Sequence, residues 1–312
     1  MSTVSTRHLV DPELLPLLDS FPAMNLSPEA LPAIRAGIAG MLTSQPLPDL
    51  QVEKREIFIP SGEGDRSIRC LLIQPLALPA KAPVILHFHG GGHVLGTPEM
   101  NLPQLMRWAA RLDCLVLSVD YRLAPETPFP GPMDDAYAAL RWLNEMADEL
   151  GIDRARVAVS GESAGGAMAA SLCHMARDRG EYAIAFQHLE MPRLDDRLPD
   201  PPNPFTGEFI WRAENSEFCR AAYLAGSTSP YASAARADDL TGLPPAYIMV
   251  GALDLFVDEC LAYTARLIRA GVPAELIVYP GCFHGFRIAG EAAVTKRADD
   301  DSLRALSKAF AR

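Results

Sequence analysis

A serine, an acid and a histidine occur in this chain in an order that suits nucleophilic catalysis. Ser163 lies at the centre of Gly161–Gly165, which reads Gly-Glu-Ser-Ala-Gly and joins a short apolar run to an alanine-rich stretch. A strand, a tight turn and a helix in this order are typical of a nucleophile elbow, where flanking glycines leave room for the turn. The positive end of the helix favours negative charge there. A plain glycine-rich turn is the alternative, and the position between strand and helix favours the elbow.

Candidates for the base and its acidic partner follow Ser163 along the chain. Asp254 and His284 each come shortly after an apolar run that is typical of a buried strand. His284 would remove the Ser163 proton, and Asp254 would hold the imidazole in the correct tautomer. Asp258 competes for the acid's role, but it begins the next predicted helix and suits an N-cap better. The order Ser, Asp, His at strand ends predicts a triad of Ser163, Asp254 and His284.

Three consecutive glycines, Gly90, Gly91 and Gly92, follow an apolar run upstream of the serine. Their backbone N–H groups are unobstructed by side chains and, with the N–H of Ala164, can bind the oxyanion of a tetrahedral intermediate. A flexible loop and a dinucleotide fingerprint are the alternatives. The spacing to Gly96 is wrong for the fingerprint. The position of the glycines favours an oxyanion hole.

Three histidines near these glycines raise the question of a metal site. His87 and His89 would lie on one face of a strand, with His93 further along, but no carboxylate or cysteine beside them completes a ligand set. We therefore predict no metal and no cofactor, and a structural role for His89 as an anchor of the glycine loop. The following segment 120–126 is predicted to lock a loop near the site, with Arg122 pairing with Glu126.

The elements that must position these residues alternate along the chain. An opening hairpin is expected from segments 52–59 and 67–73, which alternate apolar and polar residues. Continuous apolar runs then predict parallel strands covered on both faces, at 84–88, 115–119, 157–159, 247–250 and 276–279. Helical patterns lie between and after them, at 102–112, 133–150, 164–179, 259–270 and 300–310. This alternation predicts a doubly wound α/β fold with a mostly parallel sheet.

Proline is concentrated in two zones that interrupt this succession. Seven prolines fall within the first 50 residues and five fall between Pro192 and Pro204, where regular helices and central strands are disfavoured. We interpret residues 1–50 as an N-terminal cap segment and 51–312 as the catalytic domain, with a cap insertion at about 185–235. Aromatic residues of the insertion either line a pocket or pack the cap, namely Phe205, Phe209, Trp211 and Phe218.

Composition limits the function further. The 312 residues carry a net charge of −11, which disfavours binding to nucleic acid. No segment approaches the roughly 20 apolar residues of a membrane span, and the N-terminus lacks the pattern of a secretory signal, so a cytoplasmic protein is expected. The six cysteines form no CxxC pair, which predicts free thiols and neither a zinc site nor disulfides.

Together, the glycine triplet after His89, the segment 120–126, the serine pentapeptide, Asp254 and the segment 280–286 resemble the hormone-sensitive lipase family of bacterial esterases. The resemblance spans about residues 50–290. It implies an α/β-hydrolase fold with a helical cap, no cofactor, and hydrolysis of short- to medium-chain acyl esters. It also implies the roles of the residues, with Ser163 as nucleophile, Asp254 and His284 as its partners, and Gly91, Gly92 and Ala164 as oxyanion donors.

This chain departs from the family pattern at two places. The position after the glycines is often aromatic in the family but is His93 here, and Leu255-Phe256 follows Asp254 where the family commonly has Pro-Leu. These differences bear on substrate preference. The leading prediction is a serine carboxylesterase acting on a small-molecule ester. The alternatives are an amidase, lactonase or peptidase with the same triad, or a receptor of the same fold that does not catalyse. A homodimer stays open, since the sequence does not locate an apolar edge to support one.

Overall fold

Eight strands of the described chain form a single sheet. The computed structural model describes residues 5–22, 24–43, 46–197 and 202–311. The order in the sheet is β1-β2-β4-β3-β5-β6-β7-β8. Neighbours from β4 to β8 are parallel, whereas β2 pairs antiparallel with both β1 and β4. The strands are β1 Val52–Pro60, β2 Ser67–Pro75, β3 Ala82–Phe88, β4 Leu115–Val119, β5 Ile152–Glu162, β6 Phe186–Glu190, β7 Ala246–Gly251 and β8 Ala274–Tyr279.

The central strands are mostly apolar because both of their faces are covered. Every residue of β3, β4 and β7 is buried. Within β3, Val84, Leu86 and Phe88 belong to one hydrophobic cluster, whereas Ile85 belongs to the other. Side chains alternate between the two faces of a strand, so each apolar run supplies two cores. The predicted α/β fold and the opening hairpin of β1 and β2 are confirmed.

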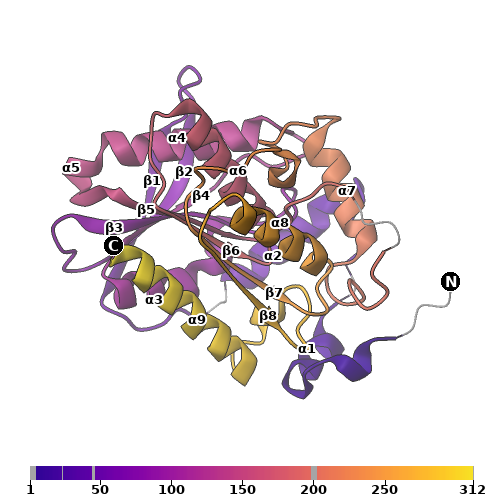
Figure 1. Cartoon of the computed structure of the whole chain (residues 1–312). Coiled ribbons are helices and arrows are strands. Elements are labelled where there is room, and N and C mark those ends of the chain that lie inside the picture. Colours follow the sequence, from indigo (N-terminus) through magenta and orange to yellow (C-terminus); the bar gives the residue numbers. More distant parts are fainter. Residues whose placement is uncertain (1–4, 23, 44–45, 198–201, 312) are drawn as a thin grey trace.

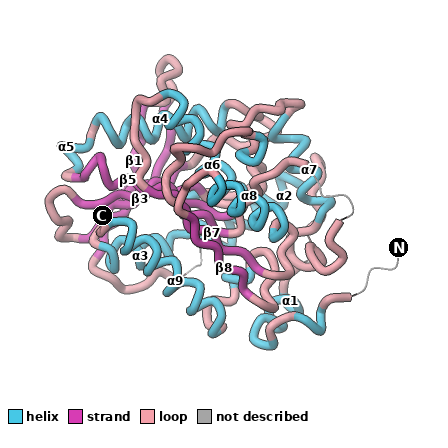
Figure 2. Tube along the Cα trace, in the orientation of Figure 1, coloured by secondary structure: helices cyan, strands magenta, loops and turns pink. Residues whose placement is uncertain are grey.

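Helices cover the two faces of the sheet in separate groups (Figures 1 and 2). Helices α4, α6 and α8 supply residues to the cluster that contains Leu86, and α3 and α9 supply residues to the cluster that contains Ile85. In the described ranges the α-helices are α1 Leu15–Ser20, α2 Leu31–Thr43, α3 Leu102–Leu112, α4 Gly131–Glu145, α5 Ala147–Leu150, α6 Ala164–Arg179, α7 Ala213–Leu224, α8 Val257–Arg269 and α9 Ala293–Phe310. The sequence pattern placed the start of the last helix at residue 300, but α9 begins earlier, at Ala293.

The N-terminal segment and the inserted segment contact each other. Asn215, a buried residue of α7, donates its Nδ2 hydrogen to the Met24 carbonyl oxygen at 2.8 Å, and its Oδ1 accepts from the Leu26 amide at 3.0 Å. The N-terminal segment that leads into α2 is therefore hydrogen-bonded to the inserted segment that carries α7. These contacts join segments separated by roughly 190 residues through one satisfied buried amide.

Strand β6 lies inside the segment 185–235 that the sequence assigned to the cap insertion. It reads Phe-Gln-His-Leu-Glu, which no apolar pattern identifies as a strand, yet all five residues are buried. Polar residues can be buried in this strand because they have hydrogen-bond partners there. His188 Nδ1, for example, lies 3.0 Å from Ser160 Oγ of β5. The chain therefore leaves this strand of the sheet only after Glu190.

Two features bear on the expectations from composition. No helix in the described ranges is long and apolar enough to cross a membrane. All six cysteines are buried with free thiols.

Candidate active site

Ser163 occupies the turn between β5 and α6 with a backbone conformation that side chains rarely adopt. Its φ is 53° and its ψ is −114°, a strained combination for a residue other than glycine. The flanking glycines have no room for a side chain. A Cβ on Gly165 would lie 2.0 Å from the Phe88 carbonyl oxygen, and one on Gly161 would lie 2.3 Å from the Gly165 carbonyl carbon. The close approach of β3, β5 and α6 explains why the pentapeptide needs glycine at both ends.

The structure brings Ser163, His284 and Asp254 together in one chain of hydrogen bonds. Ser163 Oγ lies 3.0 Å from His284 Nε2, and His284 Nδ1 lies 2.8 Å from Asp254 Oδ2. The second carboxylate oxygen of Asp254 accepts the Phe256 amide at 2.9 Å. Asp254 is fully buried, whereas Ser163 and His284 each keep 7% of their surface exposed. This geometry suits proton transfer from the serine to a histidine that is oriented by a buried carboxylate.

Asp258, the competing acid, has another environment. Helix α8 begins at Val257 with Phe256 at its N-cap, so Asp258 lies in the first turn and the expectation of an N-cap was wrong. Its carboxylate accepts hydrogen bonds from Asn203 Nδ2 at 3.2 and 3.3 Å. The structure thus brings Asp254, and not Asp258, to His284.

The turns that carry the acid and the histidine are bonded to each other. The Leu253 amide donates to the Cys282 carbonyl oxygen at 2.8 Å, and a Cβ on Gly251 would lie 2.3 Å from the same oxygen. Burial raises the pKa of the Cys282 thiol to about 12, so this group stays protonated at neutral pH. The contact between the turns fixes Asp254 and His284 relative to each other through backbone atoms.

The glycine loop after β3 lies against the elbow. A Cβ on Gly90 would meet the Glu162 side chain at 3.0 Å, and Gly91 and Gly92 have φ values of 110° and 65°. Within the described ranges, the amides of Gly91, Gly92 and Ala164 donate to no protein acceptor. Three free N–H groups beside the serine are the donor type that an oxyanion requires.

The three histidines near the glycine loop have separate partners. His87 Nδ1 lies 3.0 Å from Ser118 Oγ on the sheet, and His89 Nδ1 lies 2.8 Å from the Gly90 carbonyl oxygen. Burial lowers the pKa of His87 to about 3 and that of His89 to about 4, so both are neutral at pH 7. The described residues contain no group of three side chains placed to hold a metal ion.

The segment 120–126 braces the glycine loop, but through other partners than expected. Arg122 does not pair with Glu126. It pairs with the buried Asp135 at 2.9 Å, whereas Glu126 pairs with Arg35 of α2 at 2.7 Å. Tyr121 donates its hydroxyl hydrogen to the His89 carbonyl oxygen at 2.8 Å. Both of these ion-pair partners are distant in sequence, so no local spacing could have indicated them.

An ion pair under the site was also missed by sequence reasoning. Arg287, three residues after His284, pairs with Glu190 at the end of β6 and with Asp299 of α9. The Glu190 carbonyl oxygen accepts the Ser163 amide at 2.8 Å. Burial raises the pKa of Glu190, and the charge of Arg287 opposes that rise. This buried pair connects the histidine turn to the strand end that supports the serine.

The aromatic residues of the inserted segment lie in different environments. Trp211 is buried with its ring centroid 6.0 Å from that of His284, and Phe209 contacts Phe283 in the adjacent turn at 5.8 Å. Phe205 is half exposed, and Phe218 is partly buried against the core. Of the four candidates for a pocket lining, Trp211 is therefore the one in ring contact with the triad.

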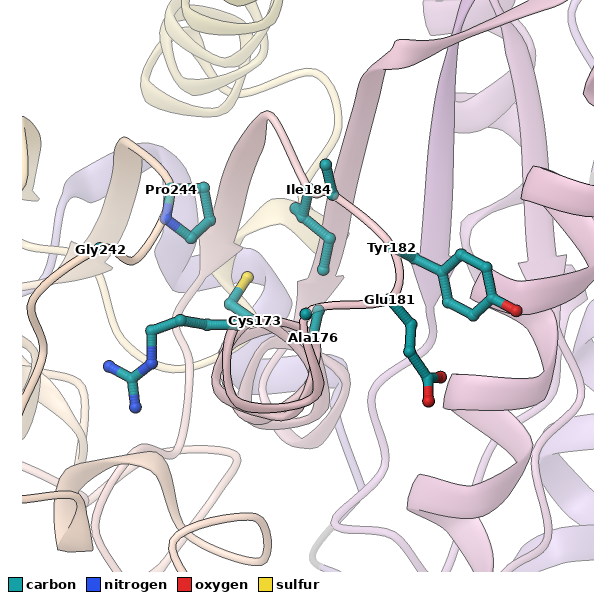
Figure 3. Close-up of a pocket in the computed structure, with 10 residues that line it drawn as sticks. Cys173, Ala176, Glu181, Tyr182, Ile184, Gly242 and Pro244 are labelled. Atoms are coloured by element: carbon teal, nitrogen blue, oxygen red, sulfur yellow. The ribbon is translucent and has the colours of Figure 1, made fainter.

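The structure has a surface cavity of about 390 Å³ beside α6 (Figure 3). Its lining includes Cys173 and Arg177 of α6 together with Glu181 and Tyr182. Arg177 is fourteen residues beyond Ser163 on the same helix, which at 1.5 Å per residue is roughly 20 Å away. This cavity is therefore not part of the site around Ser163.

Comparisons with known proteins agree with the fold and the motifs. Residues 85–288 match the family described as having the alpha/beta hydrolase fold. Esterase LipI of Mycobacterium tuberculosis is 35% identical, with 98% of this chain and 96% of that protein covered. Carboxylesterase NlhH of the same species is also 35% identical, over 89% and 88% of the two chains.

Solved structures show the same relationship. A bacterial heroin esterase superposes with a TM-score of 0.91 at 39% identity, covering 98% of this chain and 99% of that one. Esterase LipW from Mycobacterium marinum superposes with a TM-score of 0.89 at 33% identity, covering 98% of each chain. The chain belongs to the hormone-sensitive lipase family of α/β hydrolases. It is a carboxylic ester hydrolase of the serine type.

Proposed function

We propose that Ser163, His284 and Asp254 carry out the ester hydrolysis through an acyl-enzyme intermediate. The observation that carries this proposal is the hydrogen-bonded chain from Ser163 Oγ through His284 to Asp254, at 3.0 and 2.8 Å. The relatives named as esterases and carboxylesterases support ester substrates of small size. Short- to medium-chain acyl groups and a cytoplasmic location stay predictions, and a homodimer stays open.

Acylation begins with His284 Nε2 taking the proton of Ser163 as Oγ attacks the carbonyl carbon of the ester. The carbonyl oxygen becomes an oxyanion, and the amides of Gly91, Gly92 and Ala164 donate hydrogen bonds to it. Asp254 stabilises the imidazolium that forms. The intermediate then collapses as the bond to the alcohol oxygen breaks, and His284 returns the proton to the departing alcohol.

Deacylation repeats these steps with water as the nucleophile. His284 removes a proton from water, the hydroxide attacks the acyl carbon, and the same three amides bind the second oxyanion. Collapse releases the carboxylic acid, and Ser163 Oγ recovers its proton from His284. Overall, one ester and one water are consumed and one alcohol and one carboxylic acid are released, with His284 carrying the proton in both half-reactions.

A series of p-nitrophenyl esters from acetyl to palmitoyl tests the proposal. Replacing Ser163 with alanine should lower kcat by about a million-fold if the three residues act as a unit. We expect chelator-resistant activity that is highest on short to medium chains. An unchanged rate in Ser163→Ala would refute the assignment of the nucleophile, and a long-chain optimum would refute the substrate range.

Matched ester and amide substrates address the alternative activities. An amidase or peptidase using the same triad would cleave the amide at a comparable rate, whereas we expect the ester to be strongly preferred. A lactone of similar size completes the comparison. If no ester, amide or lactone is cleaved, the fold serves as a receptor and the proposed hydrolysis is wrong.

A further inference from the structure

Three buried residues beside the site carry hydrogen-bond donors that have no acceptor in the described part of the chain. They are His93, Arg193 and Trp211, which we call the donor cluster. All three guanidinium nitrogens of Arg193, both ring nitrogens of His93 and the indole nitrogen of Trp211 lack partners. Arg193 keeps only 5% of its surface exposed. A buried cation without a partner is unusual because burial removes its hydration and nothing replaces it.

The members of the donor cluster lie next to the glycine loop or to the serine turn. A Cβ on Gly92 would lie 2.9 Å from the Trp211 ring and 2.5 Å from Cys219 Sγ, so the cap rests directly on this glycine. The next residue, His93, stacks on the ring of Tyr223 with centroids 3.7 Å apart. The backbone of Arg193 contacts the serine turn, since its amide donates to the Ser163 carbonyl oxygen at 3.2 Å. Each member is thus one contact away from a residue of the reaction centre.

The charge of Arg193 affects the pKa values of residues around the glycine loop. Burial raises the pKa of Cys219 to about 12, and the charge of Arg193 opposes that rise. Burial likewise raises the pKa of Tyr223, again opposed by Arg193. Burial lowers the pKa of His93 well below its usual range, and Arg193 lowers it further. His93 is therefore a neutral ring with one N–H, next to a permanent positive charge.

The acidic residues nearby are committed to other groups. Asp254 binds His284, and Asp196 pairs with Arg236 at 2.6 Å. Glu259 accepts the Leu194 amide at 2.6 Å. Burial raises the pKa of Glu259, and the charge of Arg193 opposes that rise, although no ion pair joins the two side chains. Arg193 makes no ion pair with any of the residues that the structure describes. Water can accept hydrogen bonds from the donor cluster, but it brings no negative charge into direct contact with the guanidinium.

We propose that Arg193 is a specificity residue that binds a carboxylate on the ester substrate, with His93 and Trp211 as neighbouring donors. A carboxylate supplies several acceptor sites and a negative charge in direct contact, and a planar guanidinium binds it in a bidentate manner. The substrate class is therefore an ester with a second, ionised carboxyl group. This inference rests on the proposed hydrolysis at Ser163 and adds the chemistry of its substrate.

Two matched ester pairs test the proposal by pH-stat assay. In the first pair, monoethyl succinate carries the carboxylate on the acyl side, and ethyl 4-methylpentanoate replaces it with an isopropyl group of similar shape. In the second pair, 4-acetoxybenzoate carries it on the alcohol side, and 4-isopropylphenyl acetate is its neutral partner. We expect the anionic ester to have the higher kcat/KM in one pair, which also identifies the side of the substrate that Arg193 contacts.

The variants separate charge recognition from packing. Arg193→Met should lower the anionic-to-neutral ratio of kcat/KM by about tenfold to a hundredfold, because a charge-assisted hydrogen bond is lost. Arg193→Lys should retain part of the preference, since the charge remains. Arg220→Met is the matched control. This residue of α7 pairs with Glu217 near the surface, and its loss should leave the ratio unchanged.

A binding measurement keeps the inference independent of turnover. Calorimetric titration of Ser163→Ala with monoethyl succinate and with 4-acetoxybenzoate should show binding of one of them that disappears in the Ser163→Ala, Arg193→Met double variant. The inference is overturned if the neutral ester of each pair is preferred or bound as well as the anionic one. It is also overturned if Arg193→Met lowers kcat/KM equally for the anionic and the neutral ester of a pair. Loss of all ester hydrolysis with intact anion binding would instead refute the proposed function alone.

Discussion

The triad and the donor cluster lie close together, yet they differ in hydrogen bonding. The polar side-chain groups of the triad have partners within the protein, whereas those of the donor cluster have none in the part of the chain that the structure describes. Each side-chain oxygen and ring nitrogen of Ser163, His284 and Asp254 has a partner within the protein. The donor cluster has none among the described residues. Groups that must hold one geometry during a reaction are fixed by internal partners, which reduces reorganisation. Groups that recognise a substrate lack hydrogen-bond partners within the protein, and the correct ligand supplies them.

Among substitutions that leave Ser163 in place, the largest effect is expected at the acid of the triad. Replacing Asp254 with asparagine should lower kcat by about ten-thousand-fold, because the amide no longer stabilises the required histidine tautomer and the imidazolium. The substitution preserves shape, so the fold and substrate binding should persist. Steady-state kinetics on p-nitrophenyl butyrate measure the change.

Asp258 supplies the matched control for this experiment. It lies four residues further on, and its carboxylate contacts Asn203 rather than His284. Asp258→Asn should therefore leave kcat within about threefold of the parent, as expected for a residue outside the reacting set. Equal losses in the two variants would mean that the acid was assigned incorrectly.

The contrast between the two regions also explains what could be predicted from the sequence. Ser163, Asp254 and His284 were predictable because each lies just after a strand with an apolar core pattern, and parallel strands bring their carboxyl ends to one edge. Strand β6 was not, because His188 and its neighbours are polar and only their buried partners make them suitable for the sheet.

In the donor cluster, His93 and Trp211 were noted in the sequence, but Arg193 gave no signal. Arg193 lies in a proline-rich segment, where a single arginine is ordinarily exposed. Its burial depends on the approach of α7 and the glycine loop, and on the left-handed backbone of His93, whose φ is 64°. These are tertiary contacts between segments far apart in sequence. Arg287 and Glu190 were missed for the same reason, since neither residue indicates the other by spacing.

A smaller effect concerns the stability of the buried histidines that support the triad region. Burial lowers the pKa of His87 and His188 to about 3 and that of His89 to about 4. The unfolded chain takes up protons below about pH 6.5, whereas the folded protein does not, so stability falls as pH decreases from there toward 4. Each histidine contributes at most about 1.4 kcal/mol per pH unit to this slope. Urea unfolding at pH 7, 6 and 5 measures it.

Single substitutions attribute this slope to particular histidines. His188→Gln retains a hydrogen-bonding side chain opposite Ser160 but cannot be protonated, so its stability should depend less steeply on pH. His8 is exposed, and His8→Gln should reproduce the slope of the parent. A slope unchanged in His188→Gln would mean that this ring is already accessible to protons in the folded state.

Covalent labelling tests most directly the central claim that Ser163 is activated by its partners. The protein would be treated with a serine-directed organophosphonate and its intact and peptide masses measured, with Ser163→Ala and Asp254→Asn treated in parallel. We predict one adduct per chain on the peptide that contains Ser163, none in Ser163→Ala, and much slower labelling in Asp254→Asn. Absence of an adduct, or an adduct on another residue, would contradict the account.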